Sequence, residues 1–173
     1  SSFSDKIELE RYILEVLKNE NLEILLNENS FDINKKYENG QNLLHFVVKE
    51  KLNSKIFKFL IDKKININEK SDDNCSVLTL AISTLSNLSS EKAYNLTEII
   101  KILFREENLN FTKDLYINEK DILHHLIWLI ITEGYFWGSS EIKIKLQRNL
   151  LYILKFMFNR YIESDADLTT HFN

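Results

Sequence analysis

Hydrophobic positions recur along the chain with a period of 34 residues. Residues 22–34 (LEILLNENSFDIN) align with residues 56–68 (IFKFLIDKKININ), and residues 99–111 (IIKILFREENLNF) form a third copy with one extra residue. A fixed period of this size is typical of stacked repeats, in which each unit buries its apolar face against its neighbours. The pattern predicts a helical repeat solenoid, and solenoids mostly present an extended binding surface.

A second recurring segment predicts where helices begin. Three apolar runs each follow a residue whose side chain can accept a hydrogen bond from the first turn of a helix, namely Asn42, Ser76 and Asp121. Apolar side chains three or four positions apart predict further helices at residues 6–18 and 141–161. The chain has no Pro and three Gly, so we expect Asn, Asp and Ser to form its turns.

These segments resemble the ankyrin repeat, whose inner helix opens with a Thr-Pro-Leu-His-x-Ala-Ala pattern. The residues at its Thr position are Asn42, Ser76 and Asp121, and its Leu is kept as Leu44, Leu78 and Leu123. Its His is kept as His45 and His124, with Thr79 in the other copy. Its outer-helix pattern is matched by residues 56–68, where Lys64 replaces a Gly. The family Pro and the small Ala pair are absent from all three copies.

The resemblance implies an all-α, ankyrin-like helix-turn-helix solenoid of about four repeats in a single domain, residues 1–162. The expected units are 5–34, 35–68, 69–111 and 112–162, followed by a frayed tail at 163–173. The third unit carries about nine extra residues near 83–97, whose Ser and Asn content predicts a solvated loop with room for one helical turn at 90–96.

The family geometry also implies a partner-binding surface made of turn tips and the exposed faces of inner helices. The residues expected there are Tyr37, Glu38, Asn39, Phe46, Lys49, Glu50, Asp72, Asp73, Tyr116, His125 and Trp128. Phe46 and Trp128 are the expected anchors, because truncating an aromatic contact residue costs about 2 kcal/mol or more. Core packing is the alternative for both.

An inserted loop adds three aromatic residues, Tyr135, Phe136 and Trp137, between two glycines. One interpretation is a contact patch, since Trp and Tyr dominate interface energetics. The other is that the loop folds back as a cap over the last repeat.

Composition excludes several classes of function. The net charge is −4, so the basic field of a nucleic-acid binder is absent from the chain as a whole. The densest apolar run, residues 150–158, is about half the length needed to span a bilayer, so we expect no membrane insertion. Cys75 is the only cysteine, which rules out an internal disulfide and favours an intracellular, cytoplasmic location.

We expect no catalytic, metal or cofactor site. His124 and His125 are adjacent, and neighbouring helical side chains point about 100° apart, whereas a metal-binding pair is four positions apart. The resemblance implies that His124 bonds the backbone at the turn and that His125 faces a partner.

The predicted function is therefore non-catalytic binding of another protein. The composition, rich in Asn, Ile, Lys and Glu, suggests a host-directed effector or a viral or symbiont protein. The alternatives are a scaffold or targeting domain of a larger enzyme or toxin, and self-association through the 141–161 helix.

Overall fold

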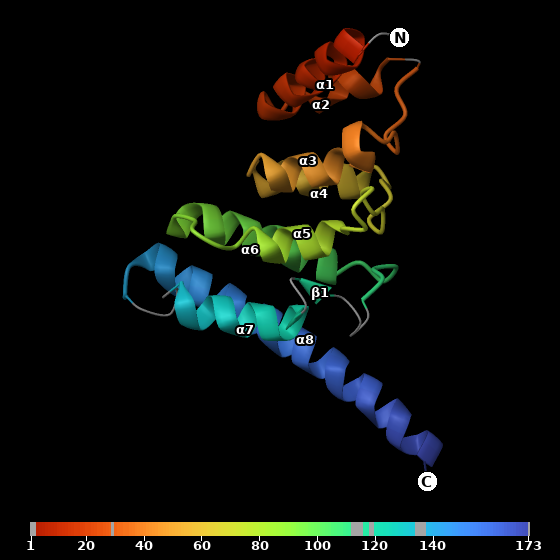
Figure 1. Ribbon diagram of the computed structural model, residues 1–173. Coiled ribbons are helices and arrows are strands. Elements are labelled where there is room, and N and C mark those ends of the chain that lie inside the picture. Colours follow the sequence, from red (N-terminus) through yellow and green to blue (C-terminus); the bar gives the residue numbers. More distant parts are fainter. Residues whose placement is uncertain (1–2, 29, 112–115, 118–119, 134–137, 173) are drawn as a thin grey trace. The chain divides into compact units, whose positions relative to one another are not determined.

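A computed structural model describes residues 3–28, 30–111, 116–117, 120–133 and 138–172. The side chains of Phe3, of residues 112–120, of Tyr161 and of residues from 164 onward lie outside this description. The helices are α1 (Phe3–Lys18), α2 (Leu22–Leu26), the 3-10 turn η1 (Glu38–Gly40), α3 (Leu43–Lys49), α4 (Ser54–Asp62), α5 (Val77–Ser83), α6 (Ser90–Phe104), α7 (Ile122–Thr132) and α8 (Glu141–Phe172) (Figure 1).

The all-α prediction is confirmed, with one small addition. Two-residue strands β1 (Tyr116–Ile117) and β2 (Lys120–Asp121) form an antiparallel pair directly before α7. The chain divides into two compact units, Ser1–Val77 and Leu78–Asn173. The boundary falls inside the third predicted repeat.

The first unit contains two pairs of helices, α1 with α2 and α3 with α4 (Figure 1). In α4 the apolar residues Ile56, Phe57, Leu60 and Ile61 recur at helical spacing, and all four are buried. Asn53 begins this helix, because its side chain accepts the Lys55 N–H at 2.9 Å. The α4 side chains therefore fill the core from one face.

The 34-residue period recurs in the hydrogen bonds of the first unit. The Tyr37 N–H donates to the Gln41 carbonyl at 2.8 Å, and 34 positions later the Ser71 N–H donates to the Cys75 carbonyl at 3.0 Å. The Asn34 N–H donates to the side chain of Asp32, and the same two-residue bond returns from Asn68 to Asn66. The hydrogen bonds of the turns and those of the side chains therefore repeat with the same 34-residue period within this unit.

The two turns of the first unit also contact each other. The Asp72 N–H donates to the Asn39 carbonyl at 2.8 Å. Gly40 lies beside this bond with φ of +70°, and a Cβ added there would be 2.9 Å from the Asp72 nitrogen. A side chain at this position would therefore strain the backbone and separate the turns.

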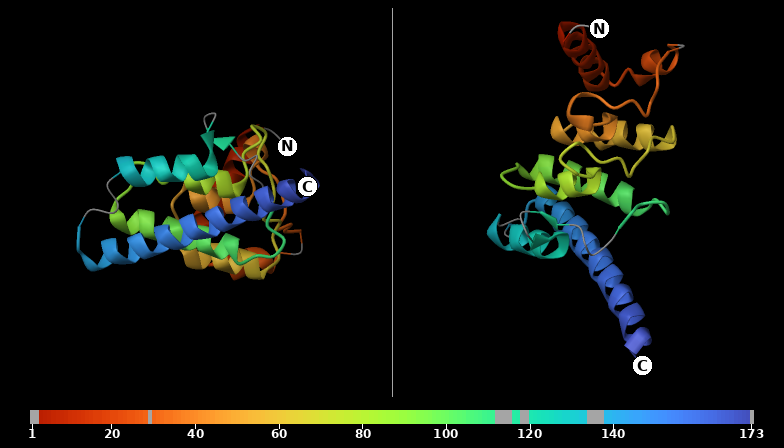
Figure 2. Two further views of the ribbon diagram at one scale, coloured as in Figure 1. Left: turned by 90° about the horizontal axis from the view of Figure 1, so that it is seen from below. Right: turned by 45° about the vertical axis from the view of Figure 1, so that its right-hand side comes forward.

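The second unit is built around the long helix α8, which packs along α6 and also contacts α7. Its N-terminal part lies beside these helices and its C-terminal end extends away from them (Figures 1 and 2). The buried side chains Leu146, Leu150, Ile153 and Met157 are four, three and four positions apart, as expected of one helical face. The segment 163–172, expected to be a frayed tail, continues this helix.

The loop predicted at 83–97 is shorter in the structure, and the single helical turn expected at 90–96 is the start of the 15-residue helix α6. Residues from Ser90 onward belong to α6, which begins at the N-cap Ser89, whose Oγ accepts the Lys92 N–H at 3.3 Å. Ala93, Leu96 and Thr97 are buried. The shorter stretch 84–89 remains a loop, held by the Glu133 carboxylate, which accepts the Asn87 N–H at 3.1 Å.

A polar cluster joins α6 to α8 inside the second unit. Asn149 is buried, and its Nδ2 donates to Thr97 Oγ1 at 3.1 Å and to Glu98 Oε1 at 2.9 Å, while Lys101 donates to its Oδ1 at 3.0 Å. Burial alone would raise the pKa of Glu98, but hydrogen bonds from Asn149 and Tyr94 and nearby positive charges leave it below its ordinary value. Each of these four side chains, Thr97, Glu98, Lys101 and Asn149, therefore has a hydrogen-bond partner within the cluster.

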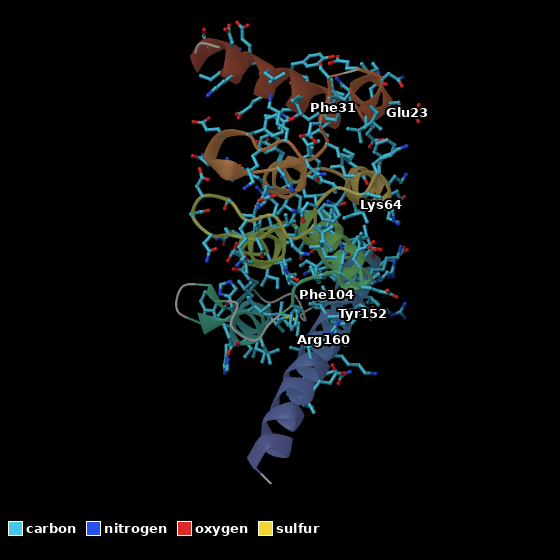
Figure 3. The ribbon with its side chains drawn as sticks, turned by 90° about the vertical axis from the view of Figure 1, so that its right-hand side faces the viewer. Glu23, Phe31, Lys64, Phe104, Tyr152 and Arg160 are labelled. Atoms are coloured by element: carbon cyan, nitrogen blue, oxygen red, sulfur yellow. The ribbon has the colours of Figure 1, made fainter. Side chains whose placement is uncertain are left out.

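Aromatic rings extend this contact toward the C-terminal end of α6. The ring of Phe104 stacks on that of Phe156 with a centroid distance of 4.2 Å, and Arg160 lies 5.3 Å above the Phe156 ring. Figure 3 labels Phe104 beside the α8 residues Tyr152 and Arg160.

Replacing Asn149 with Leu should lower the free energy of unfolding by about 1–3 kcal/mol, because buried partners lose their hydrogen bonds. Thermal unfolding followed by circular dichroism measures this change. The matched control is Asn159→Leu, an exposed asparagine on the same helix, which should change stability little. Equal melting of the two variants would show that the cluster does not hold α6 and α8 together.

Candidate functional site

The turn tips of the first unit form an exposed acidic edge. Glu38, Asn39, Asp72 and Asp73 are all exposed, as the sequence predicts. The Glu38 N–H donates to Glu10 Oε1 at 2.7 Å, and the Asp73 carboxylate accepts from the Ser71 hydroxyl. These bonds hold the edge in place, and its acidic residues remain exposed. Lys49 and Glu50, at the end of α3, are also exposed.

Two aromatic residues predicted at the binding surface lie in the core instead. Phe46 is 6% exposed and Tyr37 is 9% exposed, and their ring centroids are 5.1 Å apart. Each ring therefore covers the other, and Phe46 is not an exposed anchor. Burial raises the pKa of Tyr37 to about 12, and the negative charges of Asp32 and Glu10 act in the same direction.

His45 connects the start of α3 with the second turn. Its Nε2 lies 3.0 Å from the Cys75 carbonyl, and its Nδ1 lies 3.2 Å from the Asn42 N–H. The neutral ring with its proton on Nε2 satisfies both contacts, since Nε2 then donates and Nδ1 accepts. Burial lowers the pKa of His45, although the Cys75 hydrogen bond and the charges of Glu69 and Asp73 oppose this.

The adjacent residues His124 and His125 do not take the positions that the sequence predicts. His124 is exposed, and its Nδ1 lies 2.6 Å from an oxygen of the Asp121 carboxylate, the N-cap of α7. His125 is 8% exposed, so it is not on the exposed face where the sequence predicts it. Its ring centroid lies 6.0 Å from that of Trp128.

An exposed apolar patch lies on α7 and consists of Ile127, Trp128 and Ile131. Trp128 is 45% exposed and Ile131 is 70% exposed, and Ile127 is also exposed. Positions i, i+1 and i+4 share one side of a helix, so the three side chains adjoin. The sequence of α7 contains no Lys, Arg, Asp or Glu. Trp128 is therefore the predicted anchor that the structure places at the surface.

The remaining predicted contact residues lie outside what the structure describes. The backbone of Tyr116 belongs to β1, but its side chain is not described. Tyr135, Phe136 and Trp137 fall wholly outside the described residues, so the choice between cap and contact stays open. The exposed Ile131 was missed by the sequence reasoning, although its spacing from Trp128 could have revealed it.

A cavity of about 620 Å³ lies in the first unit, between α1 and residues 35–38. Lysines and carboxylates line it in equal number, three of each, so no single charge dominates. Among the described side chains, no group of three His, Cys, Asp or Glu could hold a metal ion. Within the same residues, no helix has the length and apolar character to cross a bilayer.

Comparison with known proteins gives no assignment. No family model, no curated protein and no solved structure matches this chain.

Replacing Phe46 with Ala should lower the free energy of unfolding by about 3–5 kcal/mol, as expected for a buried aromatic side chain. Tyr37→Phe is the informative comparison, because it keeps the ring against Phe46. It removes a buried hydroxyl for which the described residues offer no hydrogen-bond partner. Its stability should be unchanged or higher. Chemical denaturation of both variants measures these changes, and an unaltered Phe46→Ala variant would contradict the core assignment.

Stability should fall as the pH drops below about 6.5, the ordinary pKa of histidine. The pKa of His45 is lowered in the folded chain, so the unfolded chain binds the proton more readily and acid favours unfolding. Denaturation at about pH 7.5 and about pH 5.5 should show a smaller pH effect in His45→Gln than in the wild type. Identical pH effects would assign the dependence to other groups.

Proposed function

We propose that this chain is a non-catalytic protein-interaction module that binds another protein through the α7 apolar patch. The observation that carries the proposal is the exposed side chain of Trp128, flanked on one helix face by Ile127 and Ile131. Adjoining large apolar side chains at a surface are typical of protein–protein contact sites. Tryptophan is also among the residues that contribute most to binding energy.

The chemistry of the patch indicates the kind of partner. The α7 sequence carries no formal charge other than that of a protonated histidine, so desolvating the patch costs little. A complementary surface would offer an apolar or aromatic side chain that packs against the Trp128 ring. The exposed His124 lies beside the patch and would provide a polar rim.

The local repeat geometry supports an ankyrin-like interpretation of the fold. The turns at 37–41 and 71–75 share a hydrogen-bond pattern, and Asn42 and Asp121 both cap helices at corresponding repeat positions. In the ankyrin family, turn tips and inner helices form the binding surface. By this analogy, the exposed carboxylates of Glu38, Asp72 and Asp73 would contact a basic partner segment.

The test is to select binders from a peptide library with the wild-type chain and then measure their affinity for variants. Trp128→Ala should weaken binding by about 2 kcal/mol, because the anchor is lost. Its thermal melting should be nearly unchanged, because the side chain is half exposed. Ile24→Ala is the control, since Ile24 is a comparably exposed apolar residue on α2. Binders that ignore Trp128→Ala would overturn the proposal.

A further inference from the structure

We propose that copies of this chain associate head to tail, with α1 of one copy packed antiparallel on the exposed face of α8 of the next. This association uses surfaces other than the α7 apolar patch and does not depend on its function. Two observations carry it: both helices expose apolar side chains, and the charges beside those side chains are opposite and equally spaced.

The first observation concerns the outer face of α8. Opposite its buried face, α8 exposes a stripe that contains Ile144, Leu151, Phe158 and Ile162, with Leu151 and Phe158 both more than half exposed. These residues are seven, seven and four positions apart, so they follow one side of the helix. A helix that is apolar on two sides has a second surface to bury.

The α8 stripe is basic. Residues 141–160 contain five Lys and Arg residues and one carboxylate, a net charge of +4, whereas the whole chain has a net charge of −4. Arg148 and Lys155 are exposed and lie on either side of Leu151 along the stripe. An occupant of this surface therefore needs apolar side chains accompanied by negative charge.

The outer face of α1 has this chemistry. Tyr12 is exposed, although α1 buries Ile13, Val16 and Leu17 in the first unit. Glu8 and Glu15 are exposed on the same side as Tyr12, four positions before it and three after it. The whole of α1 contains four carboxylates and three basic residues, a net charge of −1, and the exposed Arg11 lies on the same side as the two glutamates.

The spacing of the charges determines the orientation. On α1 the order is Glu8, Tyr12, Glu15, with steps of four and three. Read backward, α8 has Lys155, Leu151, Arg148, again with steps of four and three. An antiparallel pair therefore places each glutamate opposite a cation and the Tyr12 ring opposite Leu151. On both helices the two charges are about 10 Å apart along the axis.

This contact joins two different surfaces, so in a pair of copies the α8 stripe of one copy and the α1 face of the other stay unused. Such heterologous contacts build rings or open chains of molecules instead of closed two-fold dimers. Because the paired charges are exposed, the association should weaken as salt is added.

The experiment is sedimentation velocity of the full chain over a roughly hundredfold range of concentration, where mass should increase with concentration. Two double variants test the register: Glu8→Lys with Glu15→Lys, and Arg148→Glu with Lys155→Glu. Each alone should lower the association constant about tenfold or more, since like charges then face each other. A mixture of the two should recover association, and so should one chain with all four changes.

Lys49→Glu with Lys55→Glu is the control, because it reverses two exposed charges outside both helices and should leave association intact.

Four results would each overturn the proposal. A chain that stays monomeric throughout has no such contact. Association that survives either double variant uses other surfaces. A finite dimer that survives the α1 variant is a two-fold α8 pair. Loss without recovery on mixing shows that the two helices do not face each other.

Discussion

The first unit depends on the hydrogen bonds of the buried Asn42 side chain. Helix α3 has seven residues, too few to be stable alone, so it must be held at its start. The Asn42 oxygen accepts the Leu44 and His45 N–H groups, and its amide donates to the Asn66 carbonyl at 3.0 Å. Asn42 therefore caps the helix and makes a tertiary contact at the same time. His45 makes a further tertiary contact, to the Cys75 carbonyl.

The second unit reaches stability by a different route. Its helices α6 and α8 have 15 and 32 residues, so a long interface replaces the short capped turns. Asn149 and its partners fix the register of this apolar interface, because their hydrogen bonds form in one alignment of the two helices only. The Glu133 carboxylate, just after α7, holds the loop at Ser86 and Asn87. The α7 helix is thereby tied to the entrance of α6.

The features that face solvent differ in chemistry from one helix to the next. The α7 patch is apolar and carries no Lys, Arg, Asp or Glu, the α8 stripe is apolar and basic, and the α1 face is apolar and acidic. Charge determines which surfaces attract and which repel, while apolar area supplies most of the binding energy. Surfaces with these differences can serve separate contacts, so the partner binding proposed for α7 would leave α1 and α8 available to other copies.

The sequence by itself determined the features that depend on local hydrogen bonds and periodicity: the caps at Asn42 and Asp121, the apolar face of α4 and the all-helical class. It could not decide which of His124 and His125 points inward, because adjacent polar residues carry no periodic signal. Nor could it predict that Phe46 is buried and Trp128 exposed, because both are aromatic residues on predicted inner helices. Only the tertiary structure decided this, since Phe46 is covered by Tyr37 from the turn just before its helix, whereas Trp128 remains half exposed.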